Sequence, residues 1–187
     1  MKKIIAILFC YCLTFSLSAQ DLFNAVKGEV SFFSKAPIED IKAENTQAAS
    51  VINIASSQIA VVIPIRNFHF EKELMEEHFN EKYLESDKFP MASFKGLILD
   101  SDSVFLEGNH NAIAKGILSI HGVEKEVELM GTISRIENVM TLNCEFKVAL
   151  KDFNIVIPKL LFQNIAEIID VKLSLEYKLG TKNTPTK

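Results

Sequence analysis

The stretch LMEEHFNEKYLESDKFPMASFKG, from Leu74 to Gly96, decides which fold is expected. Met75, Phe79 and Tyr83 recur in it at four-residue spacing, which places them on one face of a short amphipathic helix. Polar turn residues follow, and Pro90 limits any continuation of the helix. The chain then alternates between apolar and polar residues, which is typical of a strand. One amphipathic helix among strands indicates a sheet whose open end or face is covered by that helix.

Strand patterns dominate the rest of the chain. Two hairpins are expected, one around Ala55-Ser56-Ser57 and a clearer one at His121-Gly122-Val123. No regular alternation of strands with helices indicates a parallel sheet, so the pattern predicts an all-β antiparallel barrel or sandwich and leaves both open. The expected strands are Leu22–Ser34, Thr46–Ile54, Gln58–Ile65, Met91–Asp100, Ser103–Glu107, Asn111–Ile120, Glu124–Arg135, Val139–Leu150 and Ile169–Leu179; the stretch from Pro158 to Glu167 is ambiguous.

The first twenty residues have the pattern of a signal peptide. Lys2 and Lys3 form a basic start, an apolar run extends from Ile4 to Leu17, and small residues suited to cleavage follow. The run is short for a membrane span. We therefore expect residues 1–20 to be a signal peptide and residues 21–187 to be one domain. The mature protein is expected to be periplasmic or secreted, without stable insertion into a membrane.

Loss of that segment would leave an acidic chain. Lys2 and Lys3 leave with it, so 20 basic residues become 18 against 24 acidic ones, a formal charge of −6. Nucleic-acid-binding proteins usually show the opposite balance, so nucleic acid is not an expected partner. Cys144 would be the remaining cysteine, which excludes a disulfide framework. Its place on an apolar strand face favours inert burial over reactivity.

No residue pattern predicts a catalytic or metal centre. The sequence has no nucleophile motif and no glycine-rich phosphate loop. The histidines have no histidine partner at metal-ligand spacing, and we interpret all four, His69, His78, His110 and His121, as surface or turn residues. Enzymatic activity, a metal and a cofactor are therefore not expected.

Two features permit a cavity but leave open whether the interior is hollow. Gly96, Gly116 and Gly131 interrupt strand patterns, which is typical either of tight bends in a barrel or of close approach by a ligand. Phenylalanines on apolar faces, among them Phe94 and Phe146, would either fill a core or line a pocket. An eight-stranded barrel is just wide enough for either outcome.

Together with Leu74 to Gly96, three further stretches carry a family resemblance. They are FFSKAPIEDIKAEN from Phe32, KGILSIHGVEKEVELMGTIS from Lys115 and FKVALKDFNIVIP from Phe146. In order and spacing they resemble the YceI-like family across nearly the whole mature chain. The resemblance implies a lipocalin-like antiparallel up-and-down β-barrel of about eight strands with the amphipathic helix near one end. It also implies an exported protein, a possible homodimer, and an elongated apolar pocket for an isoprenoid or similar lipid.

One block departs from that family. Members often carry Arg-x-Asp-Phe-Gly late in the chain, where this sequence has Leu150-Lys151-Asp152-Phe153-Asn154. The arginine and the glycine are absent, so the resemblance predicts no particular contact to a ligand head group.

We expect the protein to hold one long isoprenoid-like or fatty chain, as a carrier, scavenger or store. Each buried methylene contributes about 0.8 kcal/mol, whereas association costs roughly 4–15 kcal/mol, so tight binding needs a long chain. The alternative is a filled-barrel interaction or stress-response module without a ligand. The expected ligand-binding residues are Phe68, Phe70, Met75, Phe79, Phe94, Leu118, Leu129, Phe146 and Phe153.

The helix is expected to act as a gate. In this hypothesis Met75 and Phe79 point into one end of the barrel, and Phe68 and Phe70 stand at the entrance. A helix that covers the barrel without touching the ligand is the alternative.

Overall fold

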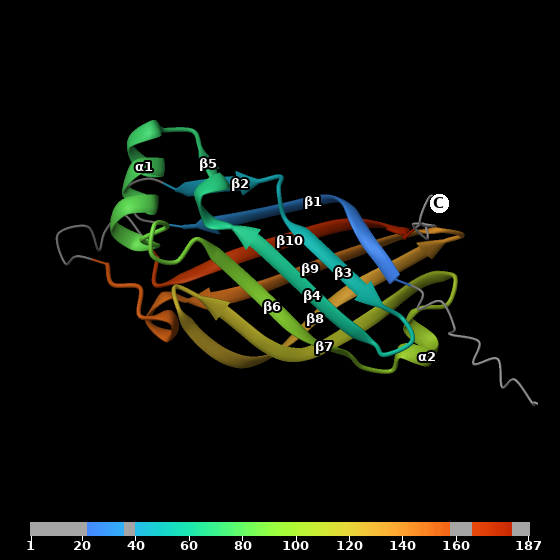
Figure 1. The fold of residues 1–187 in the computed structure, drawn as a ribbon. Coiled ribbons are helices and arrows are strands. Elements are labelled where there is room, and N and C mark those ends of the chain that lie inside the picture. Colours follow the sequence, from blue (N-terminus) through green and yellow to red (C-terminus); the bar gives the residue numbers. More distant parts are fainter. Residues whose placement is uncertain (1–21, 36–39, 158–165, 181–187) are drawn as a thin grey trace, which may run out of the picture.

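The computed structural model describes residues 22–35, 40–157 and 166–180, and they form a closed antiparallel barrel (Figure 1). Eight strands make the barrel, and each pairs with its neighbours in the order β1-β3-β4-β6-β7-β8-β9-β10, with β10 pairing back to β1. The all-β, lipocalin-like barrel with one amphipathic helix near an end is thereby confirmed. The eight strands are β1 (Leu22–Ser34), β3 (Ala49–Asn53), β4 (Gln58–Pro64), β6 (Met91–Ile98), β7 (Gly108–Ile120), β8 (Val123–Ile136), β9 (Val139–Ala149) and β10 (Ile168–Leu179).

Two short strands were not expected from the sequence. The first half of β1 pairs with β3, whereas its second half pairs with β2 (Ile41–Asn45), and β2 in turn pairs with β5 (His69–Phe70). Both elements are too brief to show a clear alternation. The wall of the barrel therefore forks along β1, and the fork lies at the end that carries the helix (Figure 1).

One predicted strand is wrong, and one strand contains an irregularity. The stretch Ser103–Glu107, expected as a strand, begins inside the short helix α2 (Ser101–Val104) and continues into a turn. Asp100 precedes this helix in a left-handed conformation with φ of 51°, and its carbonyl oxygen accepts hydrogen bonds from Ser103 N and Val104 N. Within β1, Val26 interrupts the alternation, because it is the extra residue of a β-bulge between Ala25 and Lys27 and is 55% exposed. The remaining predicted strands and both hairpins are confirmed within a few residues of their predicted ends, except that the stretch from Pro158 to Glu167 lies mostly outside the described residues.

The amphipathic helix begins at Glu73 and lies across one end of the barrel (Figure 1). Helix α1 (Glu73–His78) continues into a π-helical turn, η2 (Phe79–Tyr83), which closes with a hydrogen bond from Leu84 N to Phe79 O. The carboxylate of Glu76 accepts a hydrogen bond from Phe70 N at 3.2 Å, which ties the helix to β5. No helix in the described ranges has both the length and the apolar composition that a membrane crossing requires.

The opposite end of the barrel, near α2, is filled. Five apolar or aromatic side chains of the strands there are wholly inaccessible to solvent: Phe23, Ile52, Met140, Leu175 and Tyr177. The guanidinium of Arg135 lies 5.3 Å from the centre of the Phe23 ring and donates to Phe105 O, next to α2. These contacts close the α2 end.

The strand glycines serve the curvature of the barrel. Gly96 and Gly116 face each other in the β6–β7 ladder. A Cβ on Gly96 would lie 2.3 Å from Lys115 O, and one on Gly116 would lie 2.2 Å from Lys95 O. No side chain fits such spacing, so the close approach of β6 and β7 requires both glycines.

Candidate functional site

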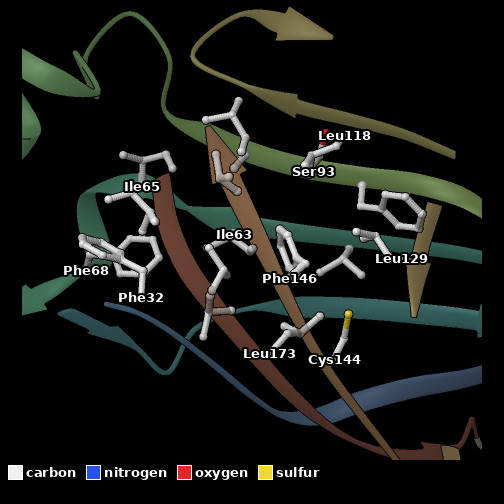
Figure 2. Close-up of a pocket in the computed structure, with 18 of the residues that line it drawn as sticks. Phe32, Ile63, Ile65, Phe68, Ser93, Leu118, Leu129, Cys144, Phe146 and Leu173 are labelled. Carbon is white, nitrogen blue, oxygen red and sulfur yellow. The ribbon is translucent and has the colours of Figure 1, made fainter. Parts of the chain in front are cut away.

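An apolar cavity of about 310 Å³ occupies the half of the barrel nearest α1. Inward-facing residues of the strands form its wall, and the face of α1 and η2 with Met75, Phe79 and Tyr83 lies at its end. Figure 2 shows the rings of Phe32 and Phe68 together at one side of this space, with Cys144, Leu129 and Leu118 farther along. The lining is mostly aliphatic and aromatic, which suits an apolar guest.

The size of the side chains explains why this half is hollow. Ala92, Ala112, Ala114, Gly131 and Cys144 all face the cavity. Larger inward residues beside them, such as Phe146 and Leu173, stay partly exposed because their neighbours are too small to cover them. In the filled half the corresponding positions carry large residues. The barrel is therefore neither wholly filled nor wholly hollow, which resolves an alternative that the sequence left open.

Four phenylalanine rings gather where the helix meets the barrel. Phe79 stacks on Phe32 with ring centres 5.5 Å apart and an interplanar angle of 23°. The Phe70 ring lies 5.0 Å from that of Phe79, and the Phe68 ring lies 5.6 Å from it in an edge-on arrangement. All four rings line the cavity. These ring contacts join the helical segment and β5 to β1 at the end of the cavity nearest α1.

The structure brings eight of the nine predicted ligand-binding residues to this cavity. They lie on or just before β5, on α1 and η2, and on the strands β6, β7, β8 and β9. These eight residues are Phe68, Phe70, Met75, Phe79, Phe94, Leu118, Leu129 and Phe146. The ninth, Phe153, is buried but does not line the cavity; it belongs to η3 (Leu150–Phe153), the turn that follows β9. Its prediction came from a sequence block, and strand alternation does not extend to a residue in a turn.

Turn η3 lies where β8 and β9 separate. Within the described chain these two strands pair only from Gly131 and Cys144 toward the α2 end. On the other side of that point, Lys125 Nζ lies 3.3 Å from Asp152 Oδ1, and His121 Nδ1 lies 3.1 Å from Phe153 O. These contacts connect β8 and its hairpin turn to η3. Turn η3 is therefore held to β8 beyond the point where the β8–β9 ladder ends.

The departure from the family block has a local explanation. Asn154 adopts a left-handed conformation with φ of 56°. Glycine takes this conformation without strain, and asparagine is one of the few other residues that tolerate it. The turn can therefore keep its backbone shape although the glycine is absent.

Three of the lining residues that the sequence analysis did not name lie on β1 or on the helical segment. Phe32 lies on the inward face of β1, and Tyr83 shares the helix face with Met75 and Phe79, so alternation and helical spacing could have identified both. His78 was interpreted as a surface or turn residue, and this was wrong for a residue that lines the cavity at the end of α1. Its spacing of three residues from Met75 could have placed it beside the inward face of the helix.

Burial suppresses ionisation at the only thiol among the described residues. The Cys144 side chain faces the cavity, and its Sγ lies 3.2 Å from Met130 O. Burial raises the pKa of this thiol to about 11, because the thiolate loses its hydration. The described residues contain no cluster of three or more potential metal ligands. The arrangement is suited to enclosing an apolar molecule.

Comparison with known proteins agrees with this architecture. A family model, the YceI-like domain, matches residues 13–177. No curated protein matches the sequence.

Solved structures share the fold at low sequence identity. A polyisoprenoid binding domain from Saccharophagus degradans, implicated in plant cell wall breakdown, has a TM-score of 0.73 at 11% identity and covers 86% of this chain and 99% of its own. Burkholderia cenocepacia BcnA has a TM-score of 0.67 at 16% identity, with 80% and 95% covered. The YCEI protein of Campylobacter jejuni has a TM-score of 0.57 at 17% identity, with 72% and 81% covered.

Proposed function

Because this chain belongs to the YceI-like domain family, we propose that it binds one long apolar chain, isoprenoid-like or fatty, in the barrel cavity. The observation that carries the proposal is the cavity of about 310 Å³ with its mostly apolar lining. Its volume falls at the lower end of the range typical of ligand pockets. The polyisoprenoid binding domain from Saccharophagus degradans, which has the same fold, supports this class of ligand.

The physical basis of binding would be removal of a hydrocarbon chain from water. Each methylene enclosed contributes about 0.8 kcal/mol, and a ten-carbon chain therefore contributes about 8 kcal/mol. Loss of translational and rotational freedom costs roughly 4–15 kcal/mol. Net affinity thus depends on enclosing most of a long chain, which favours polyisoprenoid or fatty tails over small apolar molecules.

The roles of individual residues follow from their places in the cavity. Phe94, Leu118, Leu129 and Phe146 would contact the body of the chain. The helix residues Met75 and Phe79, with Phe68 and Phe70, would contact its outer end and gate its exit. The polar end would then lie near His78 and Tyr83, which line the cavity and are partly exposed.

We further propose that the protein acts after export, as a carrier, scavenger or store in the periplasm or outside the cell. The support is the basic start and apolar run of residues 1–20, which lie outside the described residues. The mass of the protein recovered from the periplasm or medium tests this. A mass that includes residues 1–20 would contradict cleavage.

Native mass spectrometry tests ligand binding. Protein purified from a lipid-containing host, or delipidated and offered isoprenoid quinones, prenols and fatty amides, should carry one chain per protein molecule. Ala114→Phe is the control, because Ala114 faces the void and a ring there would occupy it. Binding should be lost in this variant while the fold is kept. Failure of the unmodified protein with all three lipid classes would contradict the proposal.

The same spectra distinguish the second candidate, an interaction or stress-response module without ligand. That candidate requires a filled barrel, and the cavity in one half of this barrel argues against it. The same masses would show whether the protein is a monomer or a homodimer. The homodimer remains a prediction.

A further inference from the structure

The cavity is closed toward α2, and its lining stops at a definite residue on β8 and on β9. Along β9 the inward residues line the cavity from Val148 as far as Leu142, whereas the next one, Met140, does not. Along β8 the lining ends at Ile133, and the next inward residue is Arg135. The boundary thus falls between consecutive inward residues on both strands.

The strand registers place these boundary residues in two rows. Ile133 and Leu142 are direct partners in the β8–β9 ladder, and both line the cavity. In the next row toward α2, Arg135 pairs with Met140, and Met140 pairs in turn with Tyr177 on β10. The first row is therefore the floor of the cavity, and the second row lies beneath it.

The row beneath the floor is held rigidly. Met140 and Tyr177 have no exposed surface. Ser50 Oγ lies 2.8 Å from Ala60 O and donates to it, so the Tyr177 hydroxyl, 2.7 Å from Ser50 Oγ, donates to Ser50. This chain of hydrogen bonds crosses from β10 to β3 and β4. A guest molecule can displace neither a fully packed row nor its buried hydrogen bonds without a large loss of stability.

We propose that Leu142 and Ile133 form a floor that sets the longest apolar chain the barrel encloses, so that these two residues determine chain-length specificity. The proposal rests on the proposed function, because it concerns a chain that enters from the α1 end. Methylenes added to a chain that already reaches the floor remain outside the cavity at the mouth, in contact with water. Affinity should then stop increasing with chain length at a definite number of carbons.

Linear primary alcohols that lengthen by one methylene at a time, from octanol to hexadecanol, provide the measurement by competition with a bound fluorescent apolar probe. Affinity for the unmodified protein should rise about fourfold with each methylene enclosed and then level off. Leu142→Ala should move this break to longer alcohols, because the floor recedes toward Met140. Leu142→Phe should move it to shorter ones.

The controls are Leu97→Ala and Leu97→Phe, since Leu97 is a half-exposed leucine on β6 that does not line the cavity. Both should leave the break where it is. Thermal unfolding identifies the temperatures at which every variant is folded, and Leu142→Phe decides the question by itself if Leu142→Ala does not fold.

Three results would contradict the proposal about the floor. The affinity of the unmodified protein could show no break with chain length, the break could stay in place in the folded Leu142 variants, or the Leu97 variants could displace it equally. Failure of the unmodified protein to bind any alcohol or prenol would instead remove the proposed function, and the floor with it.

Discussion

His121 Nε2 lies 3.1 Å from a carboxylate oxygen of Glu85. His121 occupies the β7–β8 turn with φ of 52°, and Glu85 follows the helical segment. The other ring nitrogen of His121 faces Phe153 O, so only the imidazolium form can donate to both oxygens at once. Glu85 also accepts from Lys88. One histidine thus connects the hairpin turn, the end of the helical segment and η3.

This relationship predicts a pH-dependent contribution of Glu85 to stability. Hydrogen bonds from Lys88 and His121 hold the pKa of the Glu85 carboxyl below its ordinary value of 4.5. A depressed pKa means that the folded state favours the carboxylate, so its contribution is present above the pKa of the unfolded chain and is lost as pH falls through the folded-state pKa. Glu85→Gln should therefore lower the free energy of unfolding at neutral pH, and its difference from the unmodified protein should shrink below about pH 4.5.

Urea unfolding at a series of pH values measures this difference. Asp87→Asn is the control, because Asp87 is an exposed carboxylate in the same turn, paired with Arg66. A difference for Glu85→Gln that stays constant from neutral pH to strongly acidic pH would contradict the role of its charge.

The gate hypothesis predicts a separation of stability from lipid exchange. Phe79→Ala removes the ring that stacks on Phe32 and should cost about 3–5 kcal/mol of unfolding free energy. It should also speed lipid exchange and weaken affinity at temperatures where the variant is folded. Phe153→Ala is the matched control, since Phe153 is buried without lining the cavity. Exchange rates that are unchanged in folded Phe79→Ala would leave Phe79 as ordinary core.

The thiol of Cys144 should report on the interior of the cavity. Only the thiolate reacts with iodoacetamide, and the raised pKa of about 11 leaves little thiolate near neutral pH. Alkylation of the folded protein should therefore be slow at pH 8 and keep rising with pH to about 11. Urea-unfolded protein should react much faster at pH 8, and a bound lipid should slow the folded reaction further. A reaction rate in the folded protein that levels off near pH 9, as for an exposed thiol, would contradict the buried position.

The hydrogen bond between Tyr177 and Ser50 should stabilise the filled end of the barrel. Tyr177→Phe keeps the ring and removes the donor, so the unfolding free energy should fall by about 1 kcal/mol. Lipid affinity should not change, because Tyr177 does not line the cavity. Tyr83→Phe at the mouth serves as comparison and should change the unfolding free energy by less than about 0.5 kcal/mol. Equal stability of Tyr177→Phe and the unmodified protein, measured by urea unfolding, would show that the buried hydroxyl contributes nothing.

Alternation and turn chemistry were sufficient to predict most of the wall. The β7–β8 hairpin follows from local residue types, since Gly122 allows positive φ in the turn and apolar residues recur at every second position along much of both strands. The helix face with Met75, Phe79 and Tyr83 follows from four-residue spacing. Short elements escaped prediction: β2, β5 and α2 contain too few residues for a period to show.

What the sequence determined by itself is therefore which strand side chains face inward, because that depends on the period of each strand, except at a bulge such as the one at Val26. Whether those side chains fill the barrel was decided only by the tertiary structure. The registers bring Gly131 beside Cys144 in one row and Met140 beside Tyr177 in another. Small residues from neighbouring strands then coincide around the cavity, and large ones coincide near α2. Empty volume is a property of such rows across strands, and no single segment of the sequence contains them.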